Sequence, residues 1–217
     1  MSKSRQPRSK PRTDKFKTDQ ERLWASEFGN EYIGRNQHDR AIASNIMMFG
    51  DILRRTPDVK SIVELGCNIG LNLRALHAID RTFDLCGYEI NRKAAAEIRG
   101  LKIANIVERT VTAKLPARKK YDLAFTKGLL IHVHPDQLPA VYDNLYSLSK
   151  RYILVSEYYN PTPVMVRYRG HDNQLFKRDF AGDLIDRYKL KLVDYGFMYR
   201  RDNYFPQSDN TWFLLSK

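Results

Sequence analysis

Two acidic residues stand where short apolar runs of the sequence end, a position in which carboxylates can bind hydroxyl groups. Glu64 lies in a β-branched run that Gly66 and Gly70 follow, and Glu89 closes a second run at residues 83–90. A strand, a glycine loop and a helix let the backbone approach a nucleotide-like ligand closely. A carboxylate at the end of the next strand can accept hydrogen bonds from both hydroxyls of a ribose. The pair predicts a site for an adenosine-type cofactor; the alternative is that Glu89 is only an exposed carboxylate at a strand end.

Groups suited to proton transfer and to anion binding follow two later apolar runs. His132 comes soon after the run at residues 121–126, and the ordinary pKa of imidazole suits removal of a proton. His171 is a second candidate for the base, and Tyr158 could orient the acceptor. The groups expected to bind the acceptor are Tyr159, Asn160, Arg167, Arg169, Lys177 and Arg178. Arginine binds carboxylate and phosphate well; the alternatives are a structural histidine and a solvated basic loop.

The spacing of apolar residues predicts the elements that must position these groups. Strands are predicted at residues 61–65, 83–90, 103–111, 121–126, 152–156, 190–200 and 211–216. Helices are predicted at residues 38–55, 71–79, 92–99, 136–149 and 180–188. This alternation predicts an α/β, Rossmann-like fold: a mostly parallel seven-stranded sheet with helices on both faces, which binds ligands at the carboxyl ends of its strands.

Two segments are predicted to add to this sheet. Residues 18–56 form an N-terminal helical cap, which begins with a capping box at Thr18 and Glu21 and has a turn at residues 29–30. Its aromatic residues either lie over the ligand or cover an open edge of the sheet, and the sequence supports both equally. Residues 157–182 form an insertion on the substrate side, expected to be polar and irregular from residue 161 onward.

Composition bounds the class of protein. The 217 residues are 42% hydrophobic, which suits one domain at residues 18–217, and carry a net charge of +12. Residues 1–17 hold seven basic residues against one acid, so we expect a disordered tail that either binds nucleic acid or only solubilises the chain. No apolar run is long enough to span a bilayer and no signal peptide is evident, so a cytoplasmic protein without membrane contact is expected, either monomer or homodimer. The two cysteines have no metal-ligand spacing, and no metal is expected.

The motif Glu-Leu-Gly-Cys-Asn-Ile-Gly at residues 64–70 resembles the first motif of class I S-adenosylmethionine (SAM) methyltransferases. The chain is more specifically similar to the methylase family associated with pseudaminic acid biosynthesis. The matching stretches are residues 20–25, 28–33, 64–73, 125–132, 156–161, 168–173 and 175–182. Asn68, where a middle glycine would stand in a pyrophosphate loop, looks like the family's own form.

The resemblance implies a class I methyltransferase fold that binds SAM. It implies cofactor contacts from Glu64, Gly66, Cys67, Asn68, Gly70, Asn72, Glu89, Ile90, Thr126 and Lys127. Many SAM enzymes also place an acid near the position of residues 110–113, where this chain has none. A backbone group or a hydroxyl is therefore expected to hold the adenine.

Three functions follow, in order of preference. The first is methyl transfer to O or N of a small anionic metabolite, such as a sugar, nonulosonic acid or sugar nucleotide. The second is methylation of nucleic acid, RNA above all, with residues 1–17 as a binding arm. The third is a SAM-binding partner subunit without catalysis.

Overall fold

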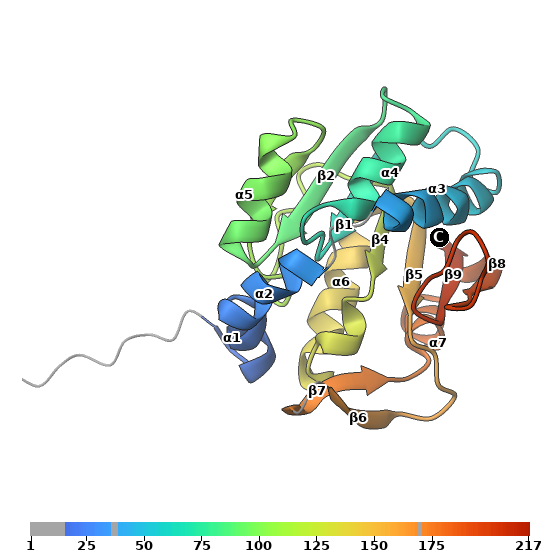
Figure 1. Cartoon of the computed structure of the whole chain (residues 1–217). Coiled ribbons are helices and arrows are strands. Elements are labelled where there is room, and N and C mark those ends of the chain that lie inside the picture. The colour runs from blue at the N-terminus through green and yellow to red at the C-terminus, as the bar shows by residue number, and fades with distance from the viewer. Residues whose placement is uncertain (1–15, 36–38, 169–170) are drawn as a thin grey trace, which may run out of the picture.

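The computed structural model describes residues 16–35, 39–168 and 171–217. Its main sheet has seven strands in the order β3-β2-β1-β4-β5-β9-β8 (Figure 1). Their bounds are β1 Ser61–Leu65, β2 Asp84–Glu89, β3 Asn105–Glu108, β4 Tyr121–Lys127, β5 Ser149–Glu157, β8 Lys191–Met198 and β9 Asn210–Ser216. β1 to β5 pair in parallel, and β9 runs antiparallel between β5 and β8. The predicted mostly parallel seven-stranded sheet is confirmed.

Helices cover both faces of this sheet (Figure 1). They are α3 Asp39–Leu53, α4 Leu71–Ile79, α5 Arg92–Gly100, α6 Leu138–Leu148 and α7 Phe180–Tyr188. One apolar core joins the sheet to α3, α4 and α5, and the other joins it to α6 and α7. Alternate residues of β1 face opposite cores: Ile62 belongs to the first, and Val63 and Leu65 to the second. β1 is buried along its whole length, as a central parallel strand requires.

The N-terminal segment forms two short helices, α1 Asp19–Trp24 and α2 Glu27–Arg35. The capping box at Thr18 is confirmed. The turn predicted at residues 29–30 is wrong, because both residues lie within α2. A Cβ at Gly29 would lie 2.0 Å from the Trp24 carbonyl oxygen and 2.7 Å from the Asn91 amide nitrogen. This glycine therefore permits close packing inside a helix.

The insertion is more regular than predicted. β6 Val164–Tyr168 and β7 His171–Lys177 form a separate two-stranded antiparallel sheet. The β-branched residues Val164 and Val166 favour a strand, but the charged and glycine residues around them hide the pattern. The predicted third strand was also too long, because β3 has only four residues. No helix in the described part of the chain is long and apolar enough to cross a membrane.

Candidate cofactor and acceptor site

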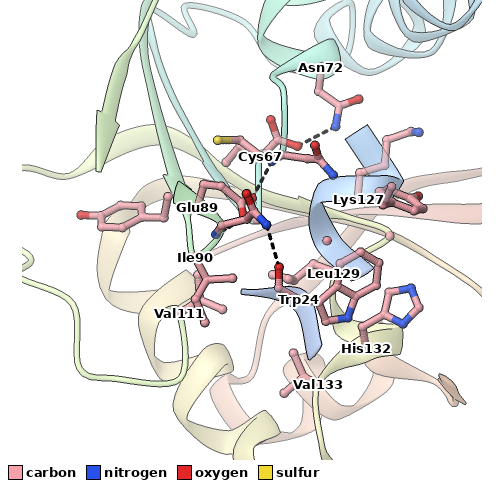
Figure 2. Close-up of a pocket in the computed structure, with 18 of the residues that line it drawn as sticks. Trp24, Cys67, Asn72, Glu89, Ile90, Val111, Lys127, Leu129, His132 and Val133 are labelled. Atoms are coloured by element: carbon pink, nitrogen blue, oxygen red, sulfur yellow. Dashed lines mark hydrogen bonds between the residues drawn. The ribbon is translucent and has the colours of Figure 1, made fainter. Parts of the chain in front are cut away.

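A cavity of about 440 Å³ opens at the carboxyl ends of β1, β2 and β4, beneath α1 and α2 (Figure 2). Strand order reverses between β1 and β4, so the cavity lies at the topological switch point where open α/β sheets bind ligands. The predicted site residues that line it are Glu64, Gly66, Cys67, Asn68, Asn72, Glu89, Ile90, Lys127 and His132. Gly70 and Thr126 lie next to lining residues in the chain but are not among them.

The loop between β1 and α4 owes its shape to three residues with positive φ. Gly66 and Gly70 both have φ of 77°, and Asn68 has φ of 48°. Asparagine adopts this left-handed region more readily than most residues, which explains physically why it can replace the middle glycine. A Cβ at Gly70 would lie 2.1 Å from Ile98 Cδ1, so this position also requires close packing against α5.

Glu89 connects this loop to the end of β2. One oxygen of its carboxylate accepts from the backbone N–H of Asn68 and the other from that of Asn91, each at 2.7 Å. Burial raises the pKa of Glu89, and the backbone donors oppose that shift. A carboxylate offers about four acceptor positions, so two remain for further hydroxyl donors. This is the arrangement expected of a group that binds a ribose diol.

Glu64 and Asn72 form a buried polar pair with unused acceptors. The Asn72 amide donates to Glu64 Oε1 at 2.5 Å. Among the described residues, neither Glu64 Oε2 nor Asn72 Oδ1 has a partner, although both atoms are buried. Such atoms destabilise the fold unless a donor reaches them. They fit the ammonium of an amino-acid group such as that of SAM.

Lys127 completes the charges at this end of the cavity. It closes β4 and lines the cavity. Burial lowers its pKa, while the nearby carboxylates of Glu64 and Glu157 oppose that shift. An ammonium and an unpaired carboxylate oxygen thus lie at the same end of the cavity, and their charges complement those of a zwitterionic amino-acid group.

Glu64 makes the stability of the ligand-free protein depend on pH. Burial raises its pKa to about 8, from an ordinary value of 4.5. The stability that the protonated carboxyl contributes is therefore fully present below pH 4.5 and is lost as the pH rises to about 8. Glu64→Gln has no carboxyl proton to lose, so its Tm relative to that of the wild type should rise by roughly 7–14 °C from pH 5 to pH 8.

Thermal unfolding without ligand measures this effect. Glu157 titrates in the same direction but is present in both proteins, so it cancels in the comparison. Glu97→Gln, at an exposed position in α5, should show no such pH-dependent difference. A Tm difference between Glu64→Gln and the wild type that stays constant with pH would contradict the buried carboxyl.

The sequence analysis missed an acid that α1 brings to the far end of the cavity. One oxygen of Glu21 accepts from the hydroxyls of Thr110 and Thr112, the latter at 2.5 Å. Burial opposes ionisation of Glu21, but these bonds and those from the backbone N–H groups of Lys17 and Thr18 lower its pKa. Glu21 therefore places a carboxylate beside residues 110–113, although that stretch itself contains no acid. The capping box identified Glu21 as a helix residue, but no local pattern indicates its long-range partners.

Asn91 was also missed, and it connects β2 to the N-terminal helices. Its side-chain oxygen accepts from the N–H groups of Lys93 and Ala94 and so caps α5. Its amide donates to the Trp24 carbonyl at 3.0 Å and to Asn30 Oδ1 at 3.1 Å. Asn91 therefore fixes α1 and α2 over the cavity. The signal in the sequence was its position directly after the second strand, as a helix N-cap.

His132 lies in the 3-10 helix η1, Leu130–His132, and is held from two sides. Glu157, at the end of β5, accepts from the backbone N–H groups of Leu129, Leu130 and Ile131 and so fixes the loop. The ring Nδ1 lies 2.8 Å from the Gln174 carbonyl oxygen of β7. A carbonyl only accepts, so Nδ1 carries the proton and Nε2 keeps its lone pair. Burial lowers the pKa of His132 to about 4, which makes the ring neutral at neutral pH.

Most of the predicted acceptor-binding residues lie away from the cavity lining. Lys177 lies over the Tyr158 ring, 5.1 Å from its centroid, and Arg178 pairs with Asp183 at 2.8 Å. Tyr159 is 44% exposed beside Phe213, Asn160 donates to Thr162, and Arg167 is exposed on β6. Arg169 and the side chain of His171 lie outside what the structure describes. Of the predicted cations, the three that the structure describes, Arg167, Lys177 and Arg178, therefore do not line the cavity.

The strand order, the glycine loop and the strand-end carboxylate together define the class I methyltransferase architecture. Residues 34–198 match the methyltransferase domain family, and the chain belongs to it. The protein is accordingly a SAM-dependent methyltransferase, with SAM as its cosubstrate. No curated protein matches the sequence significantly.

Solved structures share this fold at low sequence identity. The 1,6-didemethyltoxoflavin-N1-methyltransferase of Burkholderia thailandensis, with its acceptor and S-adenosylhomocysteine bound, has a TM-score of 0.68 at 14% identity. That match covers 90% of this chain and 88% of the other. The magnesium protoporphyrin IX methyltransferase of Synechocystis, with S-adenosylhomocysteine bound, has a TM-score of 0.65 at 13% identity, covering 92% of this chain and 100% of the other.

Proposed function

We propose that the protein transfers the methyl group of SAM to an oxygen or nitrogen of a small metabolite, with His132 as the base. The single observation that carries this proposal is the 2.8 Å contact between Nδ1 of the His132 ring and the Gln174 carbonyl oxygen. The ring Nδ1–H donates to the Gln174 carbonyl, which leaves the Nε2 lone pair as the proton acceptor on a residue that lines the cavity. A neutral, oriented imidazole is the group that removal of a hydroxyl or amine proton requires.

Other residues of the lining would bind different parts of the cofactor. SAM supplies a methyl group on a sulfonium, which a nucleophile attacks in line with the carbon–sulfur bond. Glu89 would hold the ribose hydroxyls, and Glu64, Asn72 and Lys127 the amino-acid group. As the new bond to the methyl carbon forms and the carbon–sulfur bond breaks, His132 takes the proton that leaves the acceptor. Exact positioning supplies much of the rate in such a displacement.

The acceptor is a small molecule in this proposal. The likeness to the pseudaminic acid-associated methylases favours a sugar, a nonulosonic acid or a sugar nucleotide. Arg109 is a further cation in the lining of the cavity and would suit an anionic group. Magnesium protoporphyrin IX and 1,6-didemethyltoxoflavin, named for two proteins of the same fold, are also small molecules, which supports this class of acceptor.

Transfer of labelled methyl from SAM tests the proposal. The full-length protein is incubated with a low-mass metabolite extract and, in parallel, with total nucleic acid. We expect label in low-mass products only. Label confined to nucleic acid would overturn the proposal in favour of the RNA alternative, for which residues 1–17 are the candidate arm. SAM binding without label in either pool would favour a non-catalytic partner subunit.

A further inference from the structure

Aromatic rings from three separate segments meet beside the proposed base. The Trp24 ring of α1 lies 5.1 Å from that of Tyr32 in α2, with an edge-to-face angle of 88°. It also lies 4.7 Å from the His132 ring, which in turn is 4.9 Å from Tyr168 of β6. Trp24, Tyr32 and His132 all line the cavity, and Figure 2 shows the indole beside the imidazole. The wall around the base is therefore aromatic.

One polar atom in this wall has no partner. The indole nitrogen of Trp24 is buried, and no described group accepts its hydrogen. Buried tryptophan N–H groups usually have an acceptor, because a buried donor without a hydrogen bond costs free energy. The Asn91 amide fixes the Trp24 backbone, and the Trp24 ring packs against those of Tyr32 and His132, so the ring cannot easily leave this position. An acceptor supplied by a bound molecule would satisfy the N–H.

We propose that Trp24 recognises the methyl acceptor, an inference that rests on the function proposed above. The indole N–H donates to a lone pair on the acceptor, and the Tyr32 ring, which is nearly perpendicular to that of Trp24, covers the apolar face of the acceptor ring. Because Trp24 and His132 are neighbours, the atom that receives this hydrogen bond lies next to the atom that is methylated. The acceptor is therefore a ring compound with two adjacent polar groups, one a nucleophile and the other a hydrogen-bond acceptor.

Two kinds of compound share this chemistry: sugars with a vicinal diol, and planar aromatic rings with adjacent hydroxyl or carbonyl groups. Both present an apolar face that packs on aromatic side chains. The described cations that were predicted to bind the acceptor, Arg167, Lys177 and Arg178, do not line the cavity, so ring packing and the Trp24 N–H provide the specificity in this proposal. D-glucuronate and catechol serve as probes that separate the two kinds.

The experiment compares Trp24→Phe with wild type, using the low-mass acceptor fraction labelled in the test above. Phenylalanine keeps a ring in the wall but removes the N–H. We expect kcat/KM to fall roughly 5- to 30-fold, as for loss of one buried hydrogen bond, mostly through KM. The affinity for S-adenosylhomocysteine should stay within twofold. Tyr195→Phe, at a 64% exposed position on β8, is the matched control and should leave both quantities unchanged.

The probes are then tested as competitive inhibitors of the same reaction. Inhibition by glucuronate alone assigns a sugar-type ring, and inhibition by catechol alone assigns an aromatic ring; either should weaken in Trp24→Phe. Inhibition by neither probe, or a kcat/KM within twofold of wild type, would overturn the role of Trp24. An equal loss of S-adenosylhomocysteine affinity would also overturn it, since Trp24 would then act only as a cover. If wild type labels no small molecule, the proposed function itself has failed.

Discussion

His132→Asn should lower kcat by roughly 10²- to 10⁴-fold, the usual contribution of a general base. Asparagine can still donate from its amide toward the Gln174 carbonyl, but it has no basic lone pair to take a proton. The affinity for S-adenosylhomocysteine should remain within twofold, because the cofactor groups assigned above are on other residues. Steady-state kinetics and calorimetric binding give the two quantities separately.

The pH profile of the wild type checks the same assignment. The base must be neutral, so kcat/KM should rise with pH through the pKa of His132, about 4, and His132 should cause no inflection between pH 6 and pH 8. His77→Asn, on α4 and outside the cavity lining, is the control and should leave kcat unchanged. A His132→Asn enzyme with more than a third of wild-type kcat would show that another group, or water, takes the proton.

Glu89→Gln should raise the dissociation constant for S-adenosylhomocysteine by about 10²-fold. The carboxylate accepts from two backbone N–H groups, one on each side, and still has capacity for two hydroxyls. Glutamine turns one of these positions into an NH₂ group, which faces a donor and repels it. Hydrogen bonds to a charged acceptor contribute about 1.5–3 kcal/mol each. Losing most of the energy of two such bonds gives a rise of about 10²-fold in the dissociation constant. Calorimetric titration of the folded variant measures it.

Glu108→Gln is a closely matched control for this experiment. Glu108 pairs with Glu89 across β2 and β3 and ends the next strand, but it is exposed and does not line the cavity. Its replacement should leave the dissociation constant within twofold. If Glu89→Gln binds S-adenosylhomocysteine within threefold of wild type, the assignment of Glu89 to the ribose is wrong.

The parts of the site that could be predicted lie at the ends of parallel strands. Apolar runs identify β1, β2 and β4, and parallel pairing brings their carboxyl ends together, so Glu64, Glu89 and Lys127 could be grouped without coordinates. The contribution of α1 was not predictable in this way. Glu21 reaches Thr110 and Thr112 only because α1 packs against a segment some 90 residues further along the chain, and local spacing does not encode such docking.

On the acceptor side, the sequence predicted a group of cations whose described members the folded chain does not bring together. Lys177 and Arg178 follow Gln174 closely in the sequence, and the Gln174 carbonyl contacts the ring of His132. The β6–β7 hairpin fixes the direction of each side chain, and Arg178 finds its partner in Asp183 at the start of α7. Lys177 and Arg178 are neighbours in the sequence, but strand pairing and ion pairing direct their side chains to different partners.

Asn91 has a consequence for how substitutions combine. One end of its side chain begins α5 and the other fastens α1 and α2, so a change at this position disturbs both regions at once. Substitutions at Asn30 and Asn91 should then be strongly non-additive, since each removes one half of the same bond. The effect of a substitution at position 30 in α2 should therefore depend on which residue is present at position 91, directly after β2.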